Sequence, residues 1–209
     1  MDQLYWARGT AAFAPQAVLE EAGAAYEIVA LDLEKGEHRA PKYLALNPAG
    51  TVPTLVTGDG RVLTDSAAIM LALCERHAGT GLMPEPGDPE RDAFFGWLFY
   101  LVSEIQKAYK PYYYPQRFST EPVDAPNIKA QARRQLIERW RIVEDRLVVP
   151  GPFLLGARFT AVDIFLVMLA TWFEPMEDLL ALYPNIKRCF DLAARRPALR
   201  RVLDTHGEP

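Results

Sequence analysis

The sequence predicts two domains of different class, an α/β domain followed by an all-α domain. Three observations support this prediction. Short strand-like and helix-like segments alternate over roughly the first eighty residues, six of the fourteen residues from His77 to Glu90 are Gly or Pro, and helical apolar periodicity dominates the remainder. Because proline lacks a backbone donor and glycine weakens regular structure, the Gly/Pro-rich segment indicates a linker. We therefore expect domains over 1–77 and 91–209, joined by a linker over 78–90.

Composition excludes several classes of protein. The 209 residues are 50% hydrophobic and 24% charged, with a formal net charge of -4, whereas nucleic-acid-binding surfaces are usually basic. The longest apolar stretch, residues 164–173, is too short to cross a bilayer, and the start lacks a signal-peptide pattern. We expect a cytoplasmic globular protein with no nucleic-acid or membrane partner. We expect no metal site either, since His, Cys and acidic residues do not cluster at ligand spacing.

Local signals predict the order βαβ(α)ββα in the first domain. Pro15 falls in the first turn of a helix, where its missing N–H is tolerated, and Gly23 favours the end of that helix. The turn sequence Gly-Asp-Gly at 58–60 predicts a hairpin. The expected strands cover 4–6, 26–31, 54–57 and 61–63, and the expected helices cover 15–22, 42–46 and 65–76.

In the second domain, apolar residues follow two lines along one long predicted helix. One line recurs at helical spacing from Phe94 to Ile105, and the other runs beside it from Phe95 to Tyr113. A helix that is apolar on two faces packs on two sides, so we expect this helix to take part in a homodimer. Further helices are expected over 130–148, 160–171, 185–194 and 197–205.

The most specific motif is Asn-Pro-Ala-Gly-Thr-Val-Pro-Thr-Leu at residues 47–55. A proline that enters a strand cannot donate to the hydrogen-bond ladder. A cis Val52–Pro53 bond would turn the Val52 amide and carbonyl outward, as a free edge for an extended peptide ligand. The alternative is an ordinary trans proline at a strand start, which base rates favour because only about 5–6% of X-Pro bonds are cis.

An acid and a hydroxyl stand together where a helix is expected to begin, at Asp65 and Ser66. The first backbone amides, the Ser66 hydroxyl and the positive end of the helix suit a carboxylate, while Asp65 suits an ammonium. The pair therefore fits an amino-acid head group. The alternative is a plain helix N-cap, worth about 1 kcal/mol.

Together these motifs resemble those of the cytosolic glutathione transferases, over essentially the whole chain. The resemblance is strongest to the bacterial beta class. It implies a thioredoxin-like N-terminal domain followed by an all-helical C-terminal domain. The stretches that follow the pattern are Leu-Tyr-Trp-Ala-Arg-Gly at 4–9, Ala-Pro at 14–15, Glu-Ala-Gly at 21–23, the motif at 47–53, and Phe-Leu-Leu-Gly at 153–156.

The resemblance also implies a ligand and the residues that bind it. Glutathione would be the co-substrate, with Val52 and a cis Pro53 pairing with its cysteinyl backbone. Asp65 and Ser66 would hold its γ-glutamyl end. In the second domain, Thr160 and Asp163 resemble the structural capping box of the family, for which we expect a role in folding and none in catalysis.

The sequence departs from the family where the chemistry is expected. The glutathione thiolate is the nucleophile in this family, and beta-class members typically carry a cysteine that aligns here with Ala11, often followed by a serine that aligns with Ala12. A histidine that is common on the long helix aligns with Gln106. Both reactive groups are missing. We expect no substitute among the histidines, which lie in a predicted loop, at a helix end and in the tail (His38, His77 and His206).

Thr10 is the best remaining candidate to activate the thiol, together with the backbone amides that follow it and the start of the first helix. The alternative for Thr10 is a solvated loop hydroxyl. Tyr5 is the next candidate, although strand alternation places Tyr5 and Trp6 on opposite faces, so that only one can face the site. Cys74 and Cys189 are expected to be small core residues.

Ser103, Gln106 and Tyr109 are candidates to line a cleft on the long helix. The alternative for the polar pair is a solvated helix face. The resemblance places the aromatic end of this helix over the sulfur, which implies an apolar pocket for electrophiles, although such aromatic groups are more often core. The aromatic residues are Tyr109, Tyr112, Tyr113, Tyr114 and Phe118.

These observations predict a homodimeric glutathione transferase-like protein. Its reaction would join the glutathione thiolate to a small hydrophobic electrophile, as in detoxification. A glutathione-dependent disulfide reductase and a non-catalytic glutathione-binding or assembly protein are the alternatives. The loss of both the cysteine and the histidine favours the binding protein over the reductase.

Overall fold

The computed structural model describes residues 1–148 and 150–207, which form two compact units. The first unit joins Met1–Glu85 with the chain from Ala193 onward, and the second spans Pro86–Leu192. The boundary at residue 85 falls within the Gly/Pro-rich segment. The residues after 192 depart from the expected division, because they belong to the first compact unit. The reason is that helix α10 (Pro197–His206) packs along helix α1 (Phe13–Glu21).

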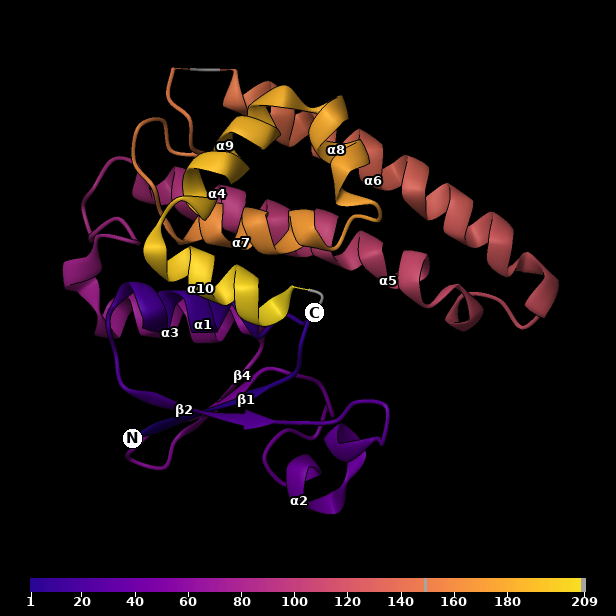
Figure 1. The fold of residues 1–209 in the computed structure, drawn as a ribbon, viewed down its shortest axis with the longest axis horizontal. Coiled ribbons are helices and arrows are strands. Elements are labelled where there is room, and N and C mark those ends of the chain that lie inside the picture. The colour runs from indigo at the N-terminus through magenta and orange to yellow at the C-terminus, as the bar shows by residue number, and fades with distance from the viewer. Residues whose placement is uncertain (149, 208–209) are drawn as a thin grey trace. The chain divides into compact units, whose positions relative to one another are not determined.

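A four-stranded mixed sheet forms the centre of the first unit (Figure 1). Its strands are β1 (Asp2–Trp6), β2 (Tyr26–Ala30), β3 (Thr54–Val56) and β4 (Val62–Thr64), in the order β2-β1-β3-β4. β1 is parallel to β2 and antiparallel to β3, and β4 pairs with β3 through the predicted hairpin. All four predicted strands are confirmed within two residues at either end.

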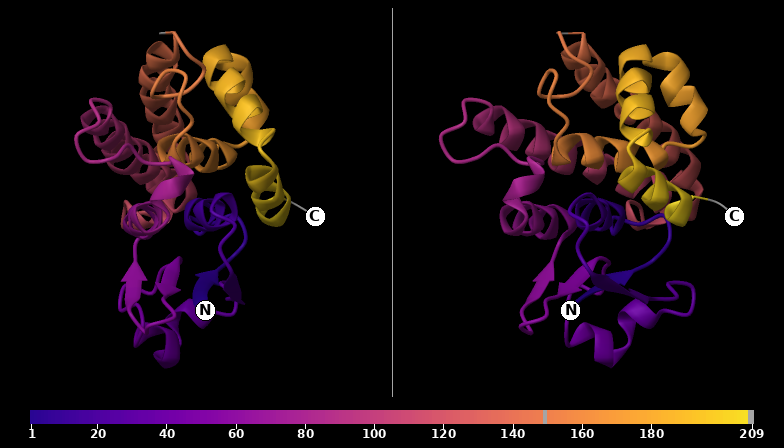
Figure 2. Two further views of the ribbon diagram at one scale, coloured as in Figure 1. Left: turned by 90° about the vertical axis from the view of Figure 1, so that its left-hand side faces the viewer. Right: turned by 60° about the vertical axis from the view of Figure 1, so that its left-hand side comes forward.

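Helices cover both faces of this sheet. α1, α3 (Ser66–Arg76) and α10 lie on one face, and the short helix α2 (Pro41–Leu44) lies on the other (Figures 1 and 2). α1 contacts both α3 and α10. The apolar faces of the sheet and of these helices meet in a core whose largest members include Leu4, Phe13, Leu19, Leu55, Ile69, Met70 and Leu73.

The second unit is helical throughout its regular structure. The long predicted helix is present as α4 (Arg91–Tyr100), a π-helical segment (Leu101–Gln106) and α5 (Lys107–Tyr113), which follow one another without a break. π-helical turns are rare and occur frequently at functional sites. The remaining helices are α6 (Ala125–Leu147), α7 (Ala161–Thr171), α8 (Met176–Leu182) and α9 (Pro184–Ala194), of which the sequence analysis missed α8.

Helix α7 is buried in the centre of the second unit, as its almost continuous apolar sequence predicts. Within its first turn, Asp163 accepts from the amide of the N-cap residue Thr160 at 2.8 Å and from the Leu154 amide of the preceding loop at 2.8 Å. The capping box is therefore confirmed. Within the described residues, no helix is both long and apolar enough to span a membrane.

Candidate functional site

The loop between β1 and α1, residues 7–12, is held by hydrogen bonds of its own Thr10 side chain. Thr10 Oγ1 donates to the Ala7 carbonyl at 2.6 Å and accepts a longer bond from the Ala12 amide at 3.4 Å. Gly9 adopts φ +67°, a left-handed conformation that glycine reaches without steric strain. The chain therefore turns sharply at Gly9 and enters α1 with Thr10 folded inward.

The hydrogen bond from Thr10 to Ala7 limits the ability of Thr10 to act as the expected thiol donor. A hydroxyl has one proton, and that of Thr10 is already donated to Ala7. Thr10 must leave this bond before it can donate to a thiolate. By contrast, the Ala11 amide has no hydrogen-bond acceptor within the described part of the chain. A free amide at a helix start suits an anion, because the helix dipole adds positive charge there.

Tyr5 and Trp6 lie on opposite faces of the sheet, as strand alternation predicts. The Tyr5 ring contacts the ring of Tyr43 on α2, with centroids 5.5 Å apart. The Trp6 indole instead lies on the α1 side, where Nε1 donates to Gln16 Oε1 at 2.9 Å. Tyr5 therefore faces the side of the sheet that carries α2.

The motif at 47–55 forms a rigid loop that leaves one residue's backbone open. Asn47, which is 2% exposed, donates through Nδ2 to the Thr51 carbonyl at 2.7 Å, and Tyr43 donates to the same carbonyl at 2.5 Å. The Val52–Pro53 bond is cis, the geometry that the resemblance implies. Neither the amide nor the carbonyl of Val52 has a partner in the described residues. A backbone amide and carbonyl left open in this way have the chemistry to pair with an extended peptide.

Gly50 in this motif is required by its surroundings. Its φ is +58°, and a Cβ at this position would lie 2.7 Å from Nη1 of Arg39 and 3.0 Å from the carbonyl oxygen of His38. Arg39 also donates to the Ala49 carbonyl at 3.2 Å, so its guanidinium lies against the open loop. His38 Nδ1 is buried and has no partner among the described residues. No motif in the sequence indicates Arg39 as a site residue.

Asp65 combines a helix cap with a strained backbone. Its Oδ1 accepts from the Ala67 and Ala68 amides at 3.0 and 3.1 Å, which confirms an N-cap for α3. Among the described non-glycine residues, it alone has a positive φ, at φ 71° and ψ 127°. Such conformations cost about 1–3 kcal/mol and cluster at ligand-binding sites. The following Ser66 is 4% exposed. The cap uses Oδ1, and Oδ2 of Asp65 takes no part in it.

His206 is a residue of this region that the sequence analysis placed in the tail and set aside. The structure corrects this, because His206 ends α10 and its ring lies against the β1–α1 loop. Nδ1 accepts from the Gly9 amide at 3.2 Å, and Nε2 lies 3.0 Å from Gln16 Oε1. The contact joins residues 197 positions apart, so local patterns could not reveal it. The amphipathic pattern of α10 shows only that this helix packs on something.

In the second unit, the three residues expected to line a cleft lie in different environments. Ser103 and Gln106 lie in the π-helical segment, and Ser103 is exposed, with Oγ donating to the Phe99 carbonyl at 2.7 Å. Tyr109 is only 2% exposed, and its hydroxyl donates to the Leu169 carbonyl at 2.9 Å. Trp140 Nε1 donates to that hydroxyl in turn. This placement corrects the expectation for Tyr109, which packs in the core because both hydroxyl bonds are met inside the unit.

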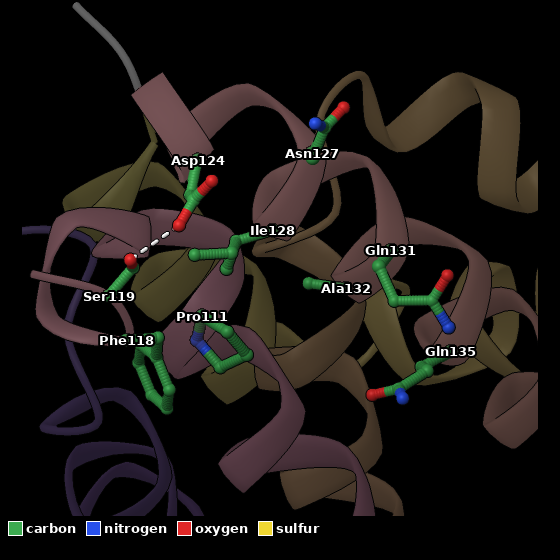
Figure 3. Close-up of a pocket in the computed structure, with 9 residues that line it drawn as sticks. All are labelled: Pro111, Phe118, Ser119, Asp124, Asn127, Ile128, Gln131, Ala132 and Gln135. Atoms are coloured by element: carbon green, nitrogen blue, oxygen red, sulfur yellow. Dashed lines mark hydrogen bonds between the residues drawn. The ribbon is translucent and has the colours of Figure 1, made fainter. Parts of the chain in front are cut away.

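An open pocket of about 440 Å³ lies between the end of α5 and the start of α6 in the second unit (Figure 3). Apolar side chains form its floor, and three amides at four-residue spacing on α6 form one wall. Ser119 Oγ donates to Asp124 Oδ2 at 2.6 Å at one end. Of the five aromatic residues expected near a substrate, Phe118 lines this pocket. The lining residues are Pro111, Phe118, Ser119, Asp124, Asn127, Ile128, Gln131, Ala132 and Gln135.

The two cysteines are buried and inert, as expected. Cys74 is 1% exposed and Cys189 is 0% exposed. Burial raises the pKa of the Cys74 thiol to about 12 and that of Cys189 well above its usual value. Neither is a thiolate nucleophile at neutral pH. No group of three or more His, Cys, Asp or Glu in the described ranges is arranged to hold a metal ion.

Comparison with known proteins identifies the family. Residues 14–76 match the family model of the glutathione S-transferase N-terminal domain, and residues 126–205 match that of the C-terminal domain. A probable glutathione S-transferase of Oryza sativa subsp. japonica is 32% identical over 203 residues, which cover 92% of this chain and 91% of the relative. The chain belongs to the cytosolic glutathione transferase superfamily.

Two bacterial glutathione transferases extend the match to nearly the full length. Glutathione S-transferase GstA of Escherichia coli O157:H7 is 27% identical over 206 residues, with 98% of each chain covered. The crystal structure of a glutathione transferase homologue from Sulfitobacter, with bound glutathione, has a TM-score of 0.89 at 27% identity and covers 98% of this chain and 97% of that one. The thioredoxin-like domain followed by a helical domain, as predicted from the sequence, is confirmed by these matches.

Proposed function

We propose that this glutathione transferase family member binds glutathione in its first unit and joins the glutathione sulfur to small hydrophobic electrophiles. The observation that carries the proposal is the pairing of two features in one unit. The Val52 backbone is open beside a cis proline, and a strained Asp65 precedes a buried Ser66 at the start of α3. An extended peptide with an amino-acid head group satisfies both features.

In this proposal each part of glutathione meets a group of matching chemistry. Val52 pairs with the cysteinyl backbone through its amide and carbonyl, next to Pro53. Asp65 accepts from the γ-glutamyl ammonium through Oδ2, and Ser66 holds the neighbouring carboxylate through its hydroxyl and its own amide at the start of α3. The guanidinium of Arg39, which lies against the 49–50 backbone, is a cation within the same unit for the remaining carboxylate.

The chemical step requires that the bound thiol lose its proton. The free Ala11 amide and the start of α1 favour the thiolate electrostatically. Thr10 is the side-chain donor in this scheme, and its hydroxyl turns from the Ala7 carbonyl to the sulfur. Tyr5 is the second donor considered, although it faces α2. The thiolate then attacks the electrophile, forming a C–S bond while the leaving group departs with its electron pair.

The second substrate is proposed to be small and hydrophobic. The pocket of about 440 Å³ in the helical unit has an apolar floor and a volume within the range of small-molecule sites. Ser103 and Gln106 remain candidates for a cleft on the π-helical segment. We also propose a cytoplasmic homodimer, because Phe99 on the second apolar line of the long helix is 60% exposed. A sedimenting species of 23.5 kDa at micromolar concentration would contradict the dimer.

One observation favours a non-catalytic glutathione-binding protein as the second candidate. The position expected to hold a reactive cysteine is Ala11, and the neighbouring Thr10 hydroxyl is already bonded within its loop. The binding features do not depend on that loop. A glutathione-dependent disulfide reductase stays a further alternative, since glutathione itself supplies the sulfur chemistry there.

A single titration distinguishes the two leading candidates. Glutathione is added to the protein across a range of pH, and thiolate absorbance is recorded together with the heat of binding. A transferase binds glutathione and lowers the thiol pKa, whereas a binding protein binds it with a solution-like thiol pKa. Absence of binding would overturn both. Parallel assays with an aromatic halide and a glutathione mixed disulfide then separate transferase from reductase.

A further inference from the structure

Helix α10 is fastened along α1 at three points spaced five residues apart. Arg196 pairs with Glu21 through two bonds of 2.8 and 2.7 Å, and Arg201 pairs with Glu20 at 2.8 Å. The third point is His206, which reaches Gln16 and the β1–α1 loop. The contacts pair residues 196, 201 and 206 with residues 21, 20 and 16, so the two helices run antiparallel. The end of α10 is thereby held next to the start of α1.

The His206 ring is enclosed by loop, strand and helix residues of the first unit. Its centroid lies 4.9 Å from that of Trp6 and 5.3 Å from that of Phe13, both in edge-on contacts. Its Nδ1 accepts from the Gly9 amide and its Nε2 lies 3.0 Å from Gln16 Oε1. Trp6 Nε1 lies 2.7 Å from His206 Nε2 and 2.9 Å from the same Gln16 oxygen. Both ring nitrogens of His206 are therefore engaged.

The protonation state of the ring follows from these contacts. Burial, with the nearby positive charge of Arg8, lowers the pKa of His206 to about 4, so the ring is neutral at neutral pH. A neutral imidazole has one donor and one acceptor nitrogen. Both ring nitrogens face an N–H group, Nδ1 that of Gly9 and Nε2 that of Trp6 at 2.7 Å. Only Nε2 also has an acceptor within reach, Gln16 Oε1, so the single ring proton is assigned to Nε2 and the Trp6 N–H to the same Gln16 oxygen. A second proton on Nδ1 would face the Gly9 N–H and break that bond.

We propose that His206 is a positioning residue for thiol activation, which holds the β1–α1 loop through the Gly9 amide. The inference rests on the proposed function for its link to glutathione. Thr10 closes the loop from within at Ala7, and His206 closes it from outside at Gly9. Glycine at φ +67° has wide conformational freedom, so an external bond is needed to keep one arrangement. That arrangement presents the Ala11 amide and Thr10 at the start of α1.

Three substitutions at His206 test separately the contributions of the ring, of the Nε2 contact and of the Nδ1 contact. His206→Asn keeps an acceptor oxygen at the Nδ1 position, His206→Gln keeps a polar group toward Gln16 only, and His206→Phe keeps only the ring. Arg201→Gln is the matched control, because it removes another α10–α1 contact far from the loop. The readouts are hydrogen exchange of the Gly9 amide in ligand-free protein, referenced to β1 amides, and the pKa of bound glutathione from thiolate absorbance.

We expect His206→Phe and His206→Gln to speed Gly9 exchange at least tenfold and to raise the bound thiol pKa by about one unit, which is tenfold less thiolate at neutral pH. His206→Asn and Arg201→Gln should change neither. Unchanged Gly9 exchange in the Phe and Gln variants would overturn the proposal. Faster exchange with an unchanged thiol pKa, or an Asn variant that behaves like the Phe variant, would overturn it also.

The two proposals fail in different ways. If the unsubstituted protein binds no glutathione, the proposed function fails, and the link between His206 and the thiol fails with it. The Gly9 exchange, measured without ligand, still decides whether His206 holds the loop. If glutathione binds with a lowered thiol pKa that none of the variants alters, the proposed function stands and the positioning role is overturned.

Discussion

Two regions of the first unit meet the proposed ligand in opposite ways. The 47–55 loop and the start of α3 leave polar groups open, at the Val52 backbone and at Oδ2 of Asp65. The β1–α1 loop instead uses its polar groups internally, through Thr10 to Ala7 and Gly9 to His206. The open region fits the proposed glutathione-binding role, and the closed region has Ala11 where the family resemblance implies a reactive cysteine.

The difference teaches that binding and activation are separable in this chain. The binding region presents an open backbone at Val52 and a carboxylate oxygen of Asp65 that is not used by the helix cap. Activation depends on particular donors near the sulfur, and here the Ala11 amide is the donor without a competing acceptor in the described residues. Substitutions in the open region should therefore change glutathione affinity, and substitutions in the closed region should change thiol pKa and stability.

The largest expected effect concerns the closed region and pH. The pKa of His206 falls from 6.5 in the unfolded chain to about 4 in the folded protein. Between those values the unfolded state binds more protons, so stability falls as pH decreases from about 6.5 to about 4 and is unaffected by this group above that range. The full difference is about 3 kcal/mol.

The measurement for this pH effect is urea unfolding of the unsubstituted protein and of His206→Phe across pH 4–7. Carboxylates titrate in both proteins, so the difference between the two curves isolates His206. We expect the stability of the variant to fall less steeply toward low pH. Parallel curves would show that the ring does not titrate between these values.

The next effect concerns the open region. Asp65→Ala should weaken glutathione binding by about 1.5–3 kcal/mol, the usual range for a hydrogen bond to a charged group. The same change removes the α3 cap, for about 1 kcal/mol of folding stability. Asp65→Asn is the matched variant, because asparagine caps as well as aspartate but lacks its charge. Calorimetric titration should find both variants weak, whereas a tight Asn variant would indicate that Asp65 is only a cap.

Gly50 tests whether the shape of the open loop matters. Gly50→Ala forces a side chain at φ +58° and places its Cβ 2.7 Å from Arg39 Nη1 and 3.0 Å from the carbonyl oxygen of His38. Gly36→Ala is the control, with a similar φ of +73° and nothing within 4 Å. Both should lose about 1 kcal/mol of stability from the backbone. Only Gly50→Ala should also reduce glutathione affinity, and equal affinity in the two variants would contradict a role for this loop.

The smallest effect is expected at Thr10. Thr10→Val removes the hydroxyl at nearly constant shape, and with it the bond to Ala7, for about 1 kcal/mol of stability. If Thr10 also donates to the thiolate, the pKa of bound glutathione rises by up to about one unit. Thr10→Ser keeps the hydroxyl and should behave as the unsubstituted protein. Coincident thiol titrations for Thr10→Val would leave activation to the Ala11 amide and the helix start.

The sequence predicted the features that depend on neighbouring residues. The strands, the hairpin, the capping box at Thr160 and the cap at Asp65 each follow from residues a few positions apart. Tyr109 was placed on a cleft because helical spacing does not distinguish a core aromatic face from a pocket-lining one. His206 was set aside because its partners lie at the other end of the sequence. The strain at Asp65 was equally invisible, since no residue pattern encodes it.

The placement of α10 has a consequence for the order of synthesis. The ribosome produces β1 and the loop after it before the helical unit, and α10 only after that unit. The first unit therefore lacks one of the helices on its sheet throughout translation of the second. Gly9 and His206 are 197 positions apart, so the loop is clamped only after the helical unit has been translated. The first unit, which precedes the helical unit along the chain, is therefore completed after it.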